Sequence, residues 1–168
     1  ITKSVNPFKF VAEKINENKV VAIFSKGAEF GPRSLGARSI LANATHSNMK
    51  EILNKKIKLR EPFRPFAPAC LEEYVNDYFL IKNQSEFMLF ICETIEHKKK
   101  LIPAVVHNDG TARVQSVSEK NNYLFKILKE YNQITNIPII INTSFNIGGE
   151  AIVNSVEDAI ESFKQMDI

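Results

Sequence analysis

Apolar residues recur along this chain with two different periods, and the longer period predicts five helices. A spacing of three or four residues places apolar side chains on one face of a helix. Asn6 and Pro7 fit the N-cap and the first position of the first helix, and Asn48 with Glu51 fits a capping box at the second. The predicted helices span residues 6–19, 47–58, 72–79, 121–131 and 154–166, and the last carries Val156, Ala159, Ile160 and Phe163 as its apolar side.

Short apolar runs rich in β-branched residues predict strands between these helices. An Asn-Asp-Gly turn between two such runs predicts a β-hairpin over residues 105–117. Because helices and strands are mixed without strict alternation, we expect one α/β or α+β domain over residues 1–168, with a twisted mixed sheet and flanking helices. Strands are predicted at 20–25, 65–71, 87–95, 102–107, 137–142 and 150–153, and Ile40 and Leu41 begin a further one.

Composition agrees with one globular domain and narrows its class. The 168 residues are 44% hydrophobic and 24% charged, which is enough for one sizeable core. No apolar run is long enough to span a membrane, and a net charge of +3 is too small to favour broad nucleic-acid binding. The N-terminus has neither a secretory signal pattern nor an initiator Met. We therefore expect a cytoplasmic domain taken from a longer protein.

Cysteines and histidines show no metal-binding spacing. Cys70 and Cys92 lack the CxxC pattern, so we expect two buried, reduced thiols. The chain also lacks HxxxH, HExxH and Cys/His clusters. The sequence therefore predicts no metal site in this chain.

A glycine-rich loop at residues 26–39 carries two arginines. Its glycines allow the backbone to approach a ligand closely, while Arg33 and Arg38 offer planar donors suited to phosphate or carboxylate. It is not a Walker loop, because GxxxxGK[ST] is absent. A surface loop in which Glu29 orients Arg33 explains the same pattern, so both interpretations stay open.

A second segment, KIKLREPFRPFAP at residues 56–68, holds several cations on a stiff stretch. Its prolines fix φ and remove backbone donors, so no helix can run through this part. Lys58 and Arg60 alternate and would share one face of an extended segment. A solvated helix end explains the preceding lysines, but it does not explain Arg60 and Arg64 among prolines and phenylalanines. Cations this close together predict an anion between them.

A third polar segment follows the strongly apolar strand at 137–142. Asn142, Ser144 and Asn146 alternate there and would face the same side just past the end of the strand, where ligands bind in open α/β sheets. A polar turn whose side chains bond their own backbone is the alternative. In the predicted hairpin, Thr111, Arg113 and Gln115 likewise alternate beside His107, although a lone histidine fits a structural role as well.

Four segments together resemble the C-terminal domain of the carbamoyltransferase family, which includes nodulation-factor and antibiotic O-carbamoyltransferases. The resemblance implies a YrdC-like fold, a twisted α/β sheet with a concave, basic cavity. It also implies a covalently linked N-terminal domain of actin-like ATPase architecture, which this chain would lack. From about residue 20 onward the segments are, in order, EFGPRSLGARSIL, LNKKIKLREPFRPFAPACLEE, IPAVVHNDGTARVQSV and IPIIINTSFNIGGEAIVNSVEDAIESF.

The resemblance implies chemistry on carbamoyl phosphate and ATP. This domain would convert these two substrates into carbamoyl adenylate and pyrophosphate, with Mg²⁺ a candidate companion of ATP. The N-terminal domain, with a metal ion, would then pass the carbamoyl group to a hydroxyl acceptor. Neither a membrane nor nucleic acid is expected as a partner, and a homodimer is left open.

YrdC-like proteins use a Lys-x-Arg pair and a Ser-x-Asn pair around the nucleotide. Lys58-Leu59-Arg60 and Ser144-Phe145-Asn146 resemble these two pairs. The chain departs from its relatives at residues 26–29, where they often have Arg-Met before Glu, and this removes one cation. The resemblance assigns catalysis to Lys58, Arg60 and Arg64, and binding of substrate or nucleotide to Arg33, Arg38, Arg113, Ser144 and Asn146. The residue patterns described above add His107, Thr111 and Asn142 to the binding residues.

Three other functional classes stay open on the sequence. An RNA-binding module would use a basic cavity and phenylalanines, but no RNP or KH signature occurs. A threonylcarbamoyl-adenylate synthase shares the fold, and an inert domain that only binds its partner domain needs no chemistry. Four phenylalanines fit core positions better than base stacking, namely Phe8, Phe63, Phe66 and Phe163.

Overall fold

The main sheet has five strands, and three of them carry segments predicted to form the site. The computed structural model describes residues 4–25 and 27–166. The order across the sheet is β1 (Val21–Phe24), β2 (Arg38–Asn43), β8 (Ile139–Ser144), β3 (Ala67–Leu71) and β7 (Gln115–Val117). Neighbours are antiparallel except β3 and β7, which are parallel, so the sheet is mixed as expected.

The central strands are buried on both faces, which explains why their sequences are almost continuously apolar. In β2, Ile40 and Leu41 belong to hydrophobic clusters on opposite sides of the sheet. In β8, Ile140 packs on the side of Leu41, while Ile139 and Ile141 pack on the other side. Alternation along a strand therefore decides which layer each side chain joins.

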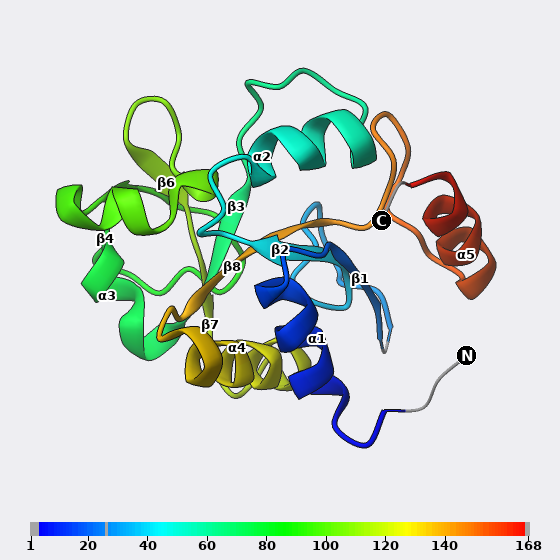
Figure 1. Cartoon of the computed structure of the whole chain (residues 1–168), viewed down its shortest axis with the longest axis horizontal. Coiled ribbons are helices and arrows are strands. Elements are labelled where there is room, and N and C mark those ends of the chain that lie inside the picture. Colours follow the sequence, from blue (N-terminus) through cyan, green and yellow to red (C-terminus); the bar gives the residue numbers. More distant parts are fainter. Residues whose placement is uncertain (1–3, 26, 167–168) are drawn as a thin grey trace.

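Two long helices cover one face of the main sheet (Figure 1). They are α1 (Pro7–Asn16) and α4 (Asn122–Thr135), and both confirm the helices predicted there. The Asn6 side chain caps α1 by accepting a hydrogen bond from the N–H of Lys9. The helix α4 ends at Asn136, whose φ of 57° is the left-handed conformation typical of a helix C-terminus.

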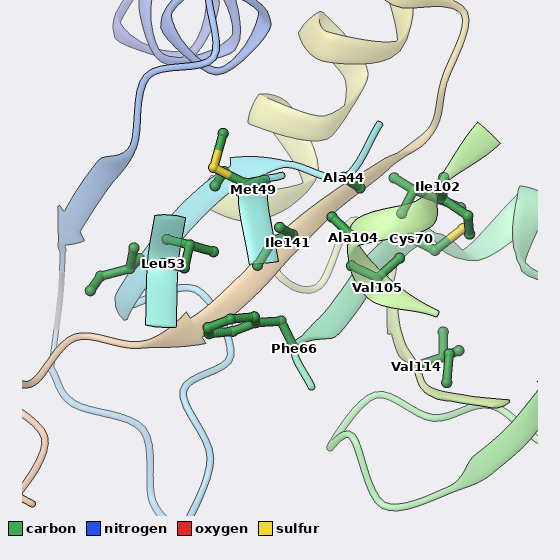
Figure 2. Close-up of a cluster of buried hydrophobic side chains, with 14 of the residues drawn as sticks. Ala44, Met49, Leu53, Phe66, Cys70, Ile102, Ala104, Val105, Val114 and Ile141 are labelled. Carbon is green, nitrogen blue, oxygen red and sulfur yellow. The ribbon is translucent and has the colours of Figure 1, made fainter. Parts of the chain in front are cut away.

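The other face is covered by short helical segments rather than one regular helix. The predicted helix at 47–58 consists of α2 (Met49–Ile52) and a π-helical stretch, η1 (Leu53–Ile57). Two 3₁₀ segments, η3 (Glu96–Leu101) and η4 (Pro103–Val105), follow later in the chain. Figure 2 shows Met49, Leu53, Ala104 and Val105 meeting Ile141 of β8 in this layer.

A second, smaller sheet is antiparallel throughout. Its strands are β4 (Phe79–Leu80), β5 (Ile91–Thr94) and β6 (Thr111–Arg113), in that order. The short predicted helix at 72–79 appears as a 3₁₀ turn, η2 (Glu72–Tyr74), followed by α3 (Val75–Tyr78).

The last helix, α5 (Val156–Gln165), lies at the edge of the molecule beyond β1 (Figure 1). It begins with a capping box in which Ser155 and Asp158 bond each other's backbone N–H groups. Its expected apolar side is only partly buried. Ala159 is covered, whereas Val156, Ile160 and Phe163 are each about half exposed. The prediction that Phe163 is a core residue is therefore wrong, and so is that for Phe63, which is 68% exposed.

The predicted hairpin at 105–117 is wrong in its pairing. The turn itself forms, because the N–H of Gly110 donates to the carbonyl of His107 and the N–H of His107 donates to Thr111. However, Pro103 starts a 3₁₀ turn where a strand over 102–107 was predicted. The strand β6 pairs with β5 instead, and β7 crosses to the main sheet.

Two further local predictions are also wrong. Residues 150–153 form no strand; Val153 is buried and its N–H donates to the carbonyl of Phe145, without a continued ladder. Asn48 makes no side-chain cap at α2, because it has φ −90° and ψ 0° rather than the extended cap conformation.

The thiols behave as the sequence predicted. Cys70 and Cys92 are both free and buried. Burial raises the pKa of Cys92 to about 11 and that of Cys70 well above its usual value. Within residues 4–25 and 27–166, no helix has the length and apolar character needed to cross a membrane.

Candidate functional site

Two loops that are far apart in sequence meet at the end of β8. One contains Lys58 and Arg60 after the π-helical stretch, and the other runs from Ser144 to Gly149. A side chain at Gly148 would overlap the carbonyl oxygen of Lys58. Glycine at this position is therefore what allows the two backbones to lie in contact.

Lys58 is the link between the two loops. Its side chain is buried, with 2% of the residue exposed, and its Nζ donates to oxygens of both Ser144 and Asn146. The distances are 3.2 Å to Ser144 Oγ and 2.8 Å to Asn146 Oδ1, and both backbone carbonyls also accept. The predicted Lys-x-Arg and Ser-x-Asn pairs thus lie in direct contact.

The surroundings of Lys58 disfavour its protonated, positively charged form. All four oxygens around Nζ are neutral groups, so they orient the amine without supplying a negative charge. Burial, and after it the nearby charge of Arg60, lower the pKa of Lys58 from 10.5 to about 7. A bound anion would supply the missing charge.

The backbone between Lys58 and Arg60 is not extended, so the predicted conformation of this segment is wrong. Lys58 has helical dihedral angles, and Leu59 has φ of +46°, the left-handed conformation. A non-glycine residue in this region is uncommon and strained. Both cations nevertheless line the same cavity. The left-handed turn at Leu59 brings their side chains to the same side, where an extended segment would have done so by alternation.

The Arg60 guanidinium is held on two sides. Its Nε donates to Oδ1 of Asn54 over 2.8 Å, and its central carbon lies 4.8 Å from the centre of the Phe66 ring. Burial, and then the charge of Arg64, lower its pKa from the usual value. The other end of the guanidinium is available to a ligand, since Arg60 lines two adjoining cavities.

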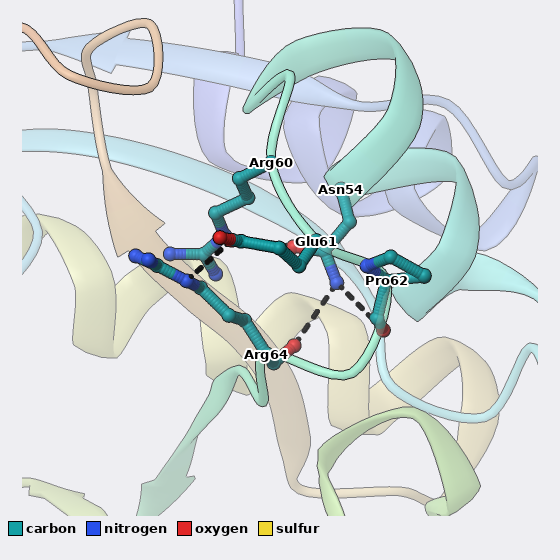
Figure 3. Close-up of polar contacts among 5 residues, drawn as sticks. All are labelled: Asn54, Arg60, Glu61, Pro62 and Arg64. Carbon is teal, nitrogen blue, oxygen red and sulfur yellow. Dashed lines mark hydrogen bonds and ion pairs between the residues drawn. The ribbon is translucent and has the colours of Figure 1, made fainter.

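Arg64 pairs with the single acid of this loop. Its Nε lies 2.8 Å from Glu61 Oε2, and both side chains are about half exposed. Figure 3 shows this pair beside Arg60, with Asn54 reaching the carbonyls of Pro62 and Arg64 from the helical side. An ion pair this exposed contributes little to stability, so the acid mainly sets where the Arg64 side chain lies.

These groups line a cavity of about 670 Å³. A smaller cavity of about 120 Å³ shares Arg60 and Ser144 with it, so the two adjoin. The larger one is lined by Lys58, Leu59, Arg60, Glu61, Arg64, Ser144, Asn146, Gly148 and Gly149. The smaller one adds three predicted site residues, Arg33, Arg113 and Asn142.

Positive charge dominates the combined cavity. Its lining holds four arginines and one lysine against the single carboxylate of Glu61. Arg113 is close enough to Arg33 that, after burial, the charge of Arg33 lowers the pKa of Arg113. Such a cluster is suited to a ligand with several negative charges, because the charges of the ligand offset the repulsion among the cations.

Three predicted site residues lie elsewhere. Arg38 is buried on β2, where its Nη1 donates to the carbonyls of Ser25 and Ala37 and its guanidinium lies 3.5 Å from the centre of the Phe24 ring. It is not among the described residues that line either cavity of the site. The geometry therefore favours a structural role for Arg38.

His107 and Thr111 also lie outside this lining and stabilise the turn before β6. His107 Nδ1 is 3.1 Å from Thr111 Oγ1, which in turn donates to Asp109 Oδ1 over 2.7 Å. Burial lowers the pKa of His107. These contacts explain the residues without a ligand.

The glycine-rich loop is organised by Glu29 through backbone N–H groups, rather than through Arg33 as one of the two open interpretations had it. Glu29 Oε1 accepts from the backbone N–H groups of Leu35 and Ala37 over 2.6 and 2.7 Å. Gly31 and Gly36 have φ of +127° and +121°, which only glycine adopts easily. The carboxylate thus shapes the loop, and Arg33 reaches the smaller cavity.

Sequence reasoning missed Asn54. This asparagine is fully buried in η1 and bonds three residues of the loop that follows. Its signal was an amide beside the apolar stripe of the helix, four residues before Lys58. No group of three or more His, Cys, Asp or Glu that could hold a metal ion occurs within the described residues.

The fold is the YrdC-like fold. The chain superposes on full-length HypF in a phosphate- and nucleotide-bound form with a TM-score of 0.68 and 22% identity, over 98% of this chain and 20% of that one. Sua5 of P. abyssi, solved with L-threonine, gives a TM-score of 0.65 and 15% identity over 95% of this chain and 45% of that one. E. coli YciO gives 0.62 and 14% identity over 95% of this chain and 74% of that one.

The chain belongs to the carbamoyltransferase C-terminal family, whose model matches residues 12–168. It is 41% identical over 161 residues to nodulation protein NolNO of Sinorhizobium fredii, covering 94% of this chain and 24% of that protein. It is 43% identical over 152 residues to nodulation protein U of Rhizobium tropici, covering 90% of this chain and 26% of that protein. The chain thus spans about a quarter of the length of these relatives.

Proposed function

We propose that this domain activates carbamoyl phosphate with ATP, forming carbamoyl adenylate for transfer to a hydroxyl acceptor elsewhere in the full-length protein. The observation that carries the proposal is the contact between Lys58 and the Ser144–Asn146 pair in a cavity that also contains Arg60. The family contains carbamoyltransferases by description, and a neighbour of the same fold was solved with phosphate and nucleotide bound.

The atoms of the proposed reaction balance with one water. Water takes the phosphoryl group of carbamoyl phosphate, which leaves carbamate and phosphate. A carbamate oxygen then bonds to the α-phosphorus of ATP, and the bond from that phosphorus to pyrophosphate breaks. The products are carbamoyl adenylate, phosphate and pyrophosphate.

The cavity is built for charge stabilisation rather than covalent catalysis. The two reactants bring several negative charges together, and cations fixed around them offset this repulsion and the charge on each leaving group. Neither cysteine fits the role of nucleophile, because both thiols are buried with raised pKa values. Lys58, Arg60 and Arg64 would therefore act by position and charge, with Arg33 and Arg113 completing the anion site.

Exchange of labelled pyrophosphate into ATP by the full-length protein tests this proposal. We expect exchange that depends on carbamoyl phosphate. Exchange that requires bicarbonate and threonine instead would favour a threonylcarbamoyl-adenylate synthase. This alternative is considered because Sua5, which has a similar fold, was solved with L-threonine. No exchange with either substrate set would contradict an adenylating function.

A further inference from the structure

Asn54 uses its whole amide group to hold the loop that carries the cations. Its Nδ2 donates to the carbonyls of Pro62 and Arg64 over 3.2 and 3.0 Å, and its Oδ1 accepts from Nε of Arg60 over 2.8 Å. The backbone carbonyl of Asn54 also accepts from the N–H of Arg60 over 3.1 Å. One residue with no exposed surface thus makes four bonds to residues 60–64.

The loop needs this support because its own sequence provides few backbone hydrogen-bond donors. Pro62 and Pro65 have no N–H to donate, and no regular element covers residues 58–66. Pro62 and Arg64 are themselves exposed residues, and the Asn54 amide ties both of their carbonyls to the helical side of the loop. The amide of Asn54 replaces the missing backbone ladder.

The bond to Arg60 also decides which nitrogens face the cavity. Asn54 occupies Nε, and the Phe66 ring covers one face of the guanidinium. Within the described residues, no hydrogen bond to either terminal nitrogen of Arg60 is present. Two donors in a fixed plane therefore stay available for an anion, which is the arrangement that binds phosphate in a bidentate manner.

We propose that Asn54 is a positioning residue that orients the Arg60 guanidinium for a phosphate-bearing ligand, and this rests on the proposed function of the cavity. Asn54 contacts no ligand in this view; it acts through Arg60. The role differs from simple support of the core, because it predicts that loss of Asn54 weakens anion binding only when Arg60 is present.

Asn54→Leu and a matched control, Asn43→Leu, test the proposal in the full-length protein. Asn43 is also a buried asparagine, and its side chain bonds Asn18, Thr45 and Tyr131, none of which lines the cavities of the site. Both substitutions should lower the melting temperature. Only Asn54→Leu should weaken binding of pyrophosphate, measured by calorimetry, by roughly tenfold or more, as for a lost bond to a charged group.

A double-mutant comparison then shows whether the effect passes through Arg60. In an Arg60→Ala background, adding Asn54→Leu should change pyrophosphate affinity by less than about twofold, because coupled residues are not additive. A full loss in both backgrounds, or unchanged affinity in Asn54→Leu alone, would overturn the proposal. Because pyrophosphate binding is measured without turnover, absence of carbamoyl-phosphate-dependent exchange would contradict the proposed function and leave this test intact.

Discussion

At the scale of single residues, the site depends on a buried amine whose partners are neutral. Lys58 is 2% exposed, and its Nζ contacts oxygens of Ser144 and Asn146 but gains no negative charge from them. Removing a cation from water costs free energy unless an anion compensates. Burial therefore disfavours the protonated form of Lys58, and an anionic ligand in the cavity would stabilise that form.

The lowered pKa of Lys58 predicts a pH dependence of stability. Below pH 7 the lysine is protonated in both folded and unfolded chains, so the folded state carries the full cost of its charge. Between about 7 and 10.5 the folded state releases this proton while the unfolded state retains it, so stability rises with pH. We expect this lysine to contribute a gain of up to about 2 kcal/mol between about pH 7 and about pH 9.

Chemical denaturation of the wild type and of Lys58→Met across this range measures that contribution. The difference between the two proteins isolates the lysine from the cysteines, whose raised pKa values act in the opposite direction at high pH. A constant difference from pH 7 to pH 9 would show that the lysine keeps an ordinary pKa.

The two residues of the Lys-x-Arg pair should each be needed for turnover. We expect Lys58→Ala and Arg60→Ala to lower carbamoyl-phosphate-dependent ATP turnover by roughly 100-fold or more, as for other lost transition-state donors. Lys55→Ala is the matched control, because Lys55 lies on the same helical segment, is exposed and pairs with Glu51. Steady-state rates near wild type for both cavity variants would remove these residues from the chemistry.

At the scale of elements, the site is formed by irregular connections fixed to regular ones. The strand β8 places Ser144, and η1 places Asn54 and is followed directly by Lys58, while the loops supply the remaining groups. The close approach at Gly148 determines how the two connections fit together. Loops positioned by a rigid scaffold are common places for binding groups.

Substitution of Gly148 tests this fit. In Gly148→Ala the added methyl group overlaps the Lys58 carbonyl, so both loops must shift. We expect a loss of about 1–3 kcal/mol in stability, typical of overpacking, together with weaker pyrophosphate binding. Gly27→Ala serves as control, since nothing lies within 4 Å of a methyl group at Gly27. Equal behaviour of the two variants in melting and binding would refute the close fit.

Elements with strong local signals were predictable from the sequence. The cap at Asn6, the strand after Pro65 and the apolar strand before Asn142 follow from side-chain chemistry and periodicity. Two other features do not follow from the sequence, because tertiary contacts decide them. They are the pairing of β6 with β5 and the left-handed turn at Leu59. The exposed apolar side of α5 likewise departs from the rule that a helix buries its apolar stripe.

The sequence predicted which residues belong to the candidate site better than it predicted how they are arranged. Residue types indicated which loops carry cationic and amide groups, and the cavities bring together eight of the eleven predicted residues. Arg38 was misplaced because spacing alone does not show that a guanidinium packs on Phe24. Asn54 was missed because an amide inside a helix usually has only a structural meaning.

At the scale of the whole molecule, charge is concentrated rather than abundant. The net charge is +3, yet five cationic side chains line the joined cavities with one carboxylate. The chain spans about a quarter of its relatives' length. Under the proposed function, the hydroxyl acceptor would bind elsewhere in the full-length protein. The domain described here would then serve as the activating half of a two-step transfer.

This concentration of charge predicts a strong salt dependence. We expect pyrophosphate affinity to fall by roughly tenfold between about 0.05 M and about 0.5 M NaCl, as screening shortens the reach of the cations. In Arg60→Ala the fall should be smaller, because one cation of the cluster is gone. Titration calorimetry at several salt concentrations measures both, and an affinity that salt leaves unchanged would argue against electrostatic binding.

The most direct measurement is a crystal structure of the full-length protein with carbamoyl phosphate and a non-hydrolysable ATP analogue. The account predicts phosphate groups in the joined cavities, with Lys58, Arg60 and Arg33 within hydrogen-bond distance of their oxygens. Nucleotide or carbamoyl phosphate bound on another face of this domain, with those three side chains in contact only with solvent, would contradict it.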